Sequence, residues 1–295
     1  MSVPNVLSGR NPVAIITDTT ASIPDELVSK LNIHLIPYYI NIGNKTLRDV
    51  FDISREKFYQ WLPTATQLPT TSNPGPGDYV RMFRELYERT KEMVVITMTS
   101  IGSGAYQAAS VAKEMITEEL PDIQVDVIDT RQVAMAQGWS VIEAARAALA
   151  GASFQRVIEI TRQTAARAMM IQTADTLKYL YMGGRIGRAI HLVGTLLNVK
   201  PLIGMEDGEI TAYGQARSRS RAYDKMVSLL TGRFGAGARL KVAYMHAAAP
   251  EEVQELRRKV EQAFQCVESL VSELSPALGV HSGPGTTGLA VVPEP

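Results

Sequence analysis

The chain has 295 residues, of which 45% are hydrophobic and 20% charged, and 30 basic residues balance 30 acidic ones. This composition is typical of a globular protein of about two domains and excludes disordered and fibrous proteins. The zero net charge argues against a nucleic-acid binder, which needs a basic surface. A single cysteine, Cys266, excludes an internal disulfide, and with only four histidines we expect no metal site.

Membrane and export signals are the next feature. No stretch approaches the roughly 18 apolar residues that span a bilayer, so we expect no transmembrane segment. The first twelve residues, MSVPNVLSGRNP, lack the apolar core of a secretory signal. Together with the lone thiol, these observations predict a soluble cytoplasmic protein.

The first 150 residues alternate short apolar strands with helices. We expect strands at Val13–Ile16, His34–Ile40, Met93–Thr97 and Ile123–Ile128. We expect helices from about Pro24 with Ser22 as cap, after Ser54 to Leu62, over Asp78–Lys91, then to Leu120 and to Ala150. Residues 63–77 are rich in Pro and Gly and predict a loop. This alternation predicts a three-layer α/β/α domain with a parallel sheet.

The second half has a different pattern. Helices are expected from Ser153 to Arg167, up to Gly183-Gly184, over Ala189–Leu197 and over Ser218–Leu230. Strands are expected at Ala168–Thr173, Lys200–Met205, Glu209–Tyr213, Lys241–His246, Cys266–Leu270 and Thr287–Val292, with a hairpin turn at Glu206-Asp207-Gly208. This mixture predicts an α+β domain with a mainly antiparallel sheet. We place the domains at residues 1–165 and 166–295.

Three small polar clusters stand between a strand and a helix: Thr17 to Thr20, Thr99 to Gly104, and Asp129-Thr130. Ligands of open parallel sheets bind beyond the carboxyl ends of the strands, and helix N-termini suit an anion. The alternative for each cluster is plain helix capping. Thr70 to Gly75 lies in the long Pro-rich loop, and loops of this length are often functional.

Two further motifs each carry a candidate residue. Gly183-Gly184-Arg185-Ile186-Gly187 follows a helix, not a strand, and therefore fails the context of a dinucleotide fingerprint. It is better interpreted as a helix end that delivers Arg185 to a carboxylate or phosphate, the alternative being a surface arginine. His281 stands beside the rigid turn Gly283-Pro284-Gly285, the alternative being a histidine in a solvent-exposed loop.

A serine hydrolase is the second hypothesis. Ser103, His281 and Asp18 supply the residue types of a catalytic triad. The sequence around the serine, Gly102-Ser103-Gly104, is not the G-x-S-x-G elbow of such enzymes. A serine-dependent acyl hydrolase that uses Ser103 and His281 is therefore kept as the alternative.

Six short motifs occur in an order that identifies a family. They are Thr17-Asp18-Thr19-Thr20, Thr71-Ser72-Asn73-Pro74, Thr99-Ser100 with Ser103-Gly104, Gly183-Gly184-Arg185-Ile186, Lys200-Pro201 and His281 with Gly283-Pro284-Gly285. From about Val13 to Val292 the sequence resembles the DegV family, the fatty-acid-binding subunits of bacterial fatty acid kinase.

The resemblance implies a carrier and not an enzyme. Such a protein encloses one long-chain fatty acid, for example palmitate, stearate or oleate, in a buried apolar tunnel between two domains, and needs no cofactor. Thr71 and Ser103 match the hydroxyls that bind its carboxylate, and Arg185 and His281 complete the polar end. A separate ATP-dependent fatty acid kinase then makes acyl phosphate. Transient contact with a membrane is compatible with this role, and methionines such as Met169, Met170 and Met182 are candidates for the tunnel lining.

Overall fold

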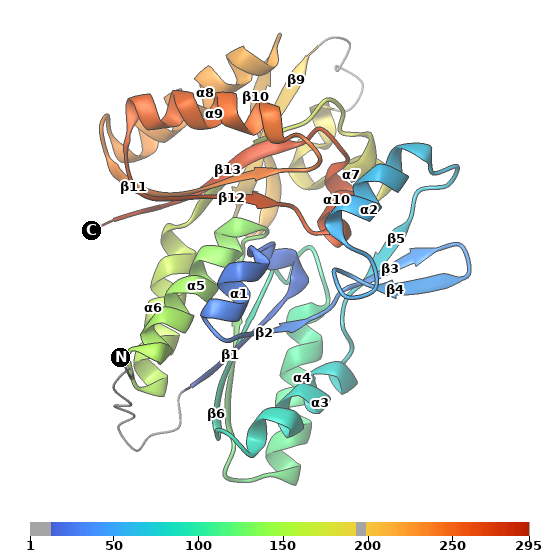
Figure 1. Cartoon of the computed structure of the whole chain (residues 1–295), viewed down its shortest axis with the longest axis vertical. Coiled ribbons are helices and arrows are strands. Elements are labelled where there is room, and N and C mark those ends of the chain that lie inside the picture. Colours follow the sequence, from blue (N-terminus) through green and yellow to red (C-terminus); the bar gives the residue numbers. More distant parts are fainter. Residues whose placement is uncertain (1–12, 193–198, 295) are drawn as a thin grey trace, which may run out of the picture.

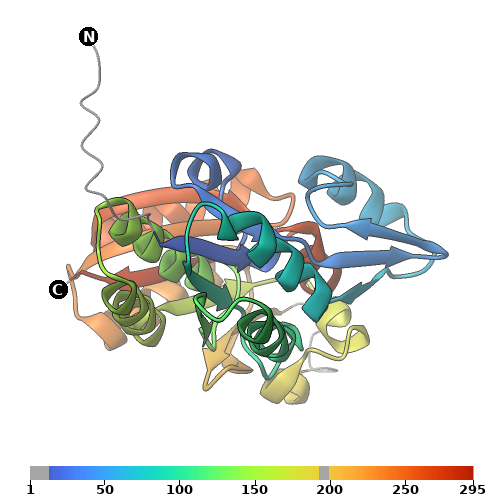
Figure 2. The same ribbon diagram turned by 90° about the horizontal axis from the view of Figure 1, so that it is seen from below.

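The computed structural model describes residues 13–192 and 199–294. Two large β-sheets and three layers of helices alternate through the molecule (Figure 1). A third, three-stranded sheet projects to one side, as Figure 2 shows from below.

The first large sheet is fully parallel and has four strands. Their order is β2 (Ile33–Ile36), β1 (Ala14–Asp18), β6 (Glu92–Thr97) and β7 (Gln124–Asp129). One face packs against α3 (Pro76–Tyr87) and α4 (Ala105–Glu119), the other against α5 (Met135–Leu149) and α6 (Phe154–Arg167). The two central strands, β1 and β6, are buried on both faces, which explains their hydrophobic runs. The predicted three-layer α/β/α arrangement is confirmed.

The second large sheet has six strands and is mainly antiparallel, as predicted. Their order is β10 (Glu209–Ala216), β9 (Lys200–Glu206), β8 (Met169–Thr173), β13 (Thr287–Pro293), β11 (Arg239–His246) and β12 (Gln265–Glu273). Only the β11–β12 pair is parallel among them. Its outer face is covered by α8 (Arg219–Phe234) and α9 (Pro250–Ala263), which lie above it in Figure 1.

The middle helix layer, α5 and α6, is shared by both sheets. One continuous apolar core joins Ile15 and Ile96 of the parallel sheet to Met245 and Ala290 of the other sheet. At its centre Trp139 of α5 is fully buried, and its indole N–H donates to the carbonyl of Ala290 at 3.1 Å. A helix between two sheets has no solvent face, so α5 is buried around nearly its whole circumference.

The expected strand His34–Ile40 is wrong as a single element. It is split at Pro37 into β2 and β3 (Tyr39–Ile42), which belong to different sheets. Strand β3 pairs with β4 (Lys45–Arg48) and with β5 (Thr70–Ser72), which lies inside the expected loop 63–77. Proline cannot continue a strand ladder because it has no N–H, and this explains the break.

Two of the three serines expected to cap helices do so. Ser54 caps α2 (Arg55–Trp61) and Ser153 caps α6, both as predicted. Ser22 does not N-cap α1 (Asp25–Lys30), which begins after Pro24; it is the left-handed C-cap residue of the short η1 helix (Thr19–Ala21). The Ser22 hydroxyl instead accepts from the backbone N–H of Ser275 at 3.0 Å, 253 residues further along the chain. A local motif therefore serves a long-range contact.

The remaining differences lie in the second half. The hairpin turn is confirmed, with Asp207 and Gly208 both at positive φ, and α7 (Lys178–Met182) ends at Gly183 as expected. In place of a helix over Ala189–Leu197 the structure has a 3-10 helix, η3 (Gly187–Leu192), and residues 193–197 lie outside the described part. The sequence analysis missed α9 and α10 (Pro276–Ser282). The domain boundary near residue 165 stays a prediction.

Candidate functional site

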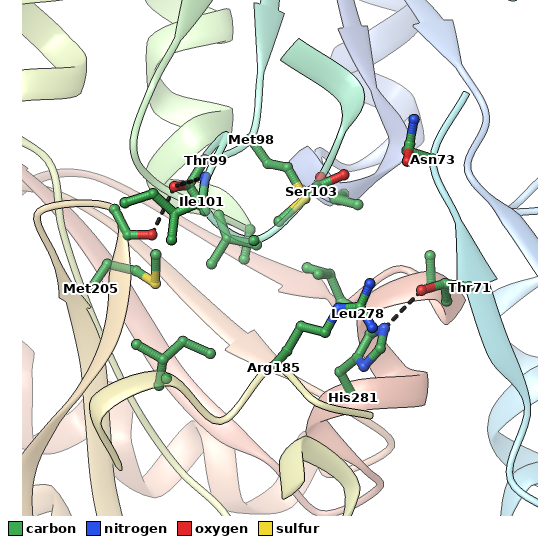
Figure 3. Close-up of a pocket in the computed structure, with 18 of the residues that line it drawn as sticks. Thr71, Asn73, Met98, Thr99, Ile101, Ser103, Arg185, Met205, Leu278 and His281 are labelled. Carbon is green, nitrogen blue, oxygen red and sulfur yellow. Dashed lines mark hydrogen bonds between the residues drawn. The ribbon is translucent and has the colours of Figure 1, made fainter. Parts of the chain in front are cut away.

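A cavity of about 880 Å³ lies where the carboxyl edge of the parallel sheet meets the second sheet. Its wall combines the loop after β6, strand β5, the segment between α7 and η3, the β9–β10 hairpin and α10. All four residues that the resemblance assigns to the polar end line it: Thr71, Ser103, Arg185 and His281. Figure 3 shows Thr71, His281 and Arg185 pointing toward one another, with Ser103 across the cavity.

Ser103 lies just before the first turn of α4. Its Oγ is 2.5 Å from the phenol oxygen of Tyr38, which also lines the cavity. Burial and the nearby Asp18 carboxyl raise the pKa of Tyr38 well above its usual value, so the phenol keeps its proton at neutral pH. The N-terminus of α4 adds partial positive charge beside Ser103, and its first N–H group, that of Ala105, donates to Ser103 Oγ at 3.3 Å. This corner of the cavity is suited to an anion.

Thr71 and His281 meet across two elements. Thr71 lies on β5 and His281 in the last turn of α10, and Thr71 Oγ1 is 2.8 Å from His281 Nε2. Burial, and secondarily the charge of Arg185, lowers the pKa of His281 to about 4. The imidazole is therefore neutral at pH 7. His281 stands in the last turn of a helix that ends at Gly283, and not in the solvent-exposed loop that was the alternative.

The Gly183-Gly184-Arg185 motif is explained by this histidine. A side-chain carbon at Gly183 would collide with Nδ1 of the His281 ring, so only glycine fits there. Gly184 has φ +68, a conformation that favours glycine. The chain then turns, and Arg185 is exposed, lines the cavity, and donates from Nη1 to the Gly183 carbonyl at 2.7 Å. As expected, the helix end delivers an arginine to the site.

The residues of the hydrolase hypothesis have other partners. The fully buried Asp18 carboxylate accepts from the backbone N–H groups of Thr20 at 3.0 Å and Met98 at 3.3 Å, and from Gln137 at 3.3 Å. Within the described residues Ser103 contacts Tyr38 and the backbone N–H of Ala105, and His281 contacts Thr71. No chain of hydrogen bonds from Asp18 through His281 to Ser103 is present there.

The rest of the wall is largely apolar. It includes Met98, Ile101, Val133, Met170, Leu180, Met205, Ile210, Leu274 and Leu278. Of the three methionines considered from the sequence, only Met170 lines the cavity; Met169 packs against the core under α8 and α9, and Met182 is exposed. The tip of the β9–β10 hairpin is held against the loop after β6, because Thr99 Oγ1 donates to the carbonyl of Gly208 at 2.7 Å.

Sequence analysis missed Tyr38 and the hairpin tip as parts of the site. Tyr38 follows Pro37 between two strands, and nothing in its local pattern marks it. The hairpin tip is recognisable as a turn, but its position over the cavity depends on how the two sheets are placed. Among the described residues, no three His, Cys, Asp or Glu side chains gather where they could hold a metal, and none of the helices has the length and apolar character needed to span a bilayer.

The neutral His281 should make stability depend on pH. Its pKa is about 4 in the fold against 6.5 ordinarily, so between these values the unfolded chain binds more protons than the native one. The free energy of unfolding therefore falls as pH falls through this window, by roughly 3 kcal/mol at completion. Urea unfolding of the wild type and His281→Gln at about pH 7 and pH 4.5 checks this. A difference between the two proteins that is the same at both pH values would contradict it.

The fold and the site define a class: an α/β protein with a cavity between its two sheets that is lined by both polar and apolar side chains. The family model of DegV, a family of uncharacterised proteins, matches residues 12–294. The chain belongs to the DegV family, which confirms the assignment made from its motifs.

Known relatives cover nearly the whole chain. A DegV domain-containing protein of Caldanaerobacter subterraneus is 30% identical over 94% of this chain and 97% of the relative. The structure of a fatty-acid-binding DegV family protein from Thermus thermophilus superposes with a TM-score of 0.89 at 27% identity, covering 96% of this chain and 100% of that one. A stearic-acid-binding protein from Eubacterium ventriosum gives a TM-score of 0.85 at 28% identity, covering 95% and 98%.

Proposed function

We propose that this protein binds one long-chain fatty acid in the cavity between its sheets, with the carboxylate held by Thr71 and Ser103. The observation that carries the proposal is that the hydroxyls of Thr71 and Ser103 and the guanidinium of Arg185 all line one largely apolar cavity of about 880 Å³. The fatty acids bound by the Thermus and Eubacterium proteins support the same ligand class.

Each of the two hydroxyls, on Ser103 and Thr71, has a neighbouring side chain that can donate a hydrogen bond to its oxygen. The protonated phenol of Tyr38 can donate to Ser103 Oγ, and the neutral His281 can donate from Nε2 to Thr71 Oγ1. In this arrangement the O–H groups of Ser103 and Thr71 are both free to donate to an anion. A carboxylate in an apolar cavity is costly unless it is hydrogen-bonded and its charge is compensated. The two hydroxyls, Arg185 and the N-terminus of α4 supply this compensation.

The energetics allow a carrier. Burying a 16-carbon chain contributes about 12 kcal/mol at roughly 0.8 kcal/mol per CH₂. Association costs about 4–15 kcal/mol, so retention depends on how well the wall fits the tail. An enclosing cavity also avoids the aggregation that an exposed acyl chain would promote.

We further propose that the bound acid is presented to a separate ATP-dependent kinase, which phosphorylates the carboxylate, and that the chain itself is a non-catalytic subunit acting in the cytoplasm. This second proposal is supported by the family resemblance and by the position of Arg185. Arg185 is exposed at the cavity and close enough to His281 to lower the pKa of the imidazole. A cation there could serve an incoming phosphoryl group.

Native mass spectrometry tests the binding step. The purified protein should carry one fatty acid per chain, which extraction identifies, and delipidated protein should take up palmitate or oleate at one equivalent. An apo mass with no uptake of either acid would end the carrier proposal.

Ser103→Ala separates a ligand-binding serine from a nucleophile. Loss of a hydrogen bond to a charged carboxylate should weaken acid binding by about 1.5–3 kcal/mol, against about 0.5–1.5 kcal/mol for a neutral acceptor. Isothermal titration of delipidated protein with oleate measures the difference. The wild type should form no adduct with a serine-directed fluorophosphonate, and a stoichiometric adduct at Ser103 would favour the hydrolase.

A further inference from the structure

Asp49 is a buried carboxylate that the proposed binding mechanism does not use. It follows β4 and is fully buried, 0% exposed. Among the described residues its Oδ2 has no hydrogen-bond partner, and burial raises its pKa to about 6. A buried carboxyl group with an unpaired oxygen costs stability.

The contacts of Asp49 join two separate parts of the site. Its backbone N–H donates to the carbonyl of Tyr38 at 2.8 Å. Its Oδ1 accepts from the backbone N–H of Ala277 at 3.2 Å, in the first turn of α10. Tyr38 is the residue behind Ser103, and α10 carries His281, the residue behind Thr71. One residue is thus hydrogen-bonded both to the backbone of Tyr38 and to the helix that carries His281.

Neighbouring groups make this junction rigid. The hydroxyls of Thr19 and Ser275 lie close enough to Asp49 to lower its pKa, and Thr19 Oγ1 also accepts from the backbone N–H of Tyr38 at 3.1 Å. Helix α10 packs tightly on α2, because a side-chain carbon at Gly279 would come within 2.7 Å of the Tyr59 hydroxyl. A small change at Asp49 would therefore be transmitted to both supports of the site.

We infer that Asp49 is a positioning residue that sets the spacing between the Ser103 and Thr71 hydroxyls by holding α10 against the segment of Tyr38. The inference rests on the proposed fatty-acid function. Asp49 touches neither hydroxyl and acts through Tyr38 on one side and through α10 and His281 on the other.

The test uses palmitate labelled with ¹³C at the carboxyl carbon, bound to the full-length protein. Two well-placed hydroxyl donors stabilise the ionised carboxylate, so the bound acid should titrate at low pH in the wild type. Asp49→Ala should raise the pKa of the bound carboxyl by about half a unit or more. Lipid occupancy, read by native mass spectrometry, should change less than about twofold, since the tail supplies most of the binding.

Two further variants make the result specific. Asp49→Asn retains an oxygen that can accept from Ala277 N–H and should return the pKa of the bound carboxyl close to the wild-type value. Asp52→Ala removes an exposed carboxylate from the same loop, where it pairs with Arg48, and should leave that pKa unchanged. Should Asp49→Ala not fold, Asp49→Ser keeps a polar group too short to reach Ala277 and carries the same expectation.

The outcomes are distinct. A folded, loaded Ala or Ser variant whose bound carboxyl titrates as in the wild type would overturn the positioning role of Asp49 and leave the fatty-acid proposal intact. A shift that Asn does not reverse would also overturn it, because the hydrogen bond to α10 would not be the cause. A wild type that takes up no labelled palmitate would instead remove the fatty-acid function on which the inference rests.

Discussion

Replacing Arg185 or His281 with Ala should leave the fatty acid bound but slow its phosphorylation by a partner kinase by about 10²-fold. The buried acyl tail outweighs one polar contact in binding energy. Negative charge builds up at the head group only when phosphate is transferred, and removal of one donor from such a site typically costs this factor. Arg185 is exposed at the cavity and His281 supports Thr71, so both stand where the charge would develop.

The measurement is acyl-phosphate formation with a cognate kinase, ATP and Mg²⁺, with lipid occupancy determined in parallel. Arg188→Ala is a matched control, because this arginine lies three residues further on and is already paired with Glu209 at 2.6 Å. It should support phosphorylation at close to the wild-type rate. Wild-type rates for both Arg185→Ala and His281→Ala at equal occupancy would show that these residues have no part in the transfer.

Trp139→Ala should cause the largest loss of stability, about 3–5 kcal/mol in the free energy of unfolding. The indole is fully buried at the centre of the core that both sheets share, and its N–H bonds to Ala290 on β13. Its removal leaves a cavity between the two sheets and an unpaired carbonyl. Because α5 packs on both sheets, we expect the variant to unfold in one transition at lower denaturant.

Urea unfolding followed by far-ultraviolet circular dichroism measures the change. Trp61→Ala is the control; Trp61 lies on α2, is only partly buried and packs at the margin of the same core. Trp61→Ala should lower the free energy of unfolding clearly less than Trp139→Ala does. A loss below about 1 kcal/mol for Trp139→Ala would contradict the view that this helix joins the two sheets energetically.

The local pattern of the sequence was enough for several strands and for the hairpin turn. Short apolar runs predicted β1 and β6, and Asp207-Gly208 predicted the turn, because these signals reside in a few adjacent residues. Helix α9 has its core residues Val253, Leu256 and Val260 on one face. This periodic signal is present in the sequence, although α9 is not among the elements expected above.

Other elements depended on partners distant in the sequence. Strands β3 and β5 lie 28 or more residues apart and become a sheet only when paired, so the short polar run Thr70–Ser72 was taken for loop. Ser22 stands where a helix cap is expected, yet it serves Ser275 across the molecule. Local propensity is outweighed when a long-range hydrogen bond satisfies the same group.

The sequence by itself determined the family and the two kinds of sheet, and its resemblance to the family predicts the four residues of the polar end, since six motifs in a fixed order carry that information. Only the tertiary structure decided what supports them. It placed Tyr38 behind Ser103 and His281 behind Thr71, and it brought Asp49 between Tyr38 and α10. Ser103 and Tyr38 are 65 residues apart, and Thr71 and His281 are 210 apart. Contacts at such separations are fixed by how the shared helix layer holds the two sheets, and no local pattern records that placement.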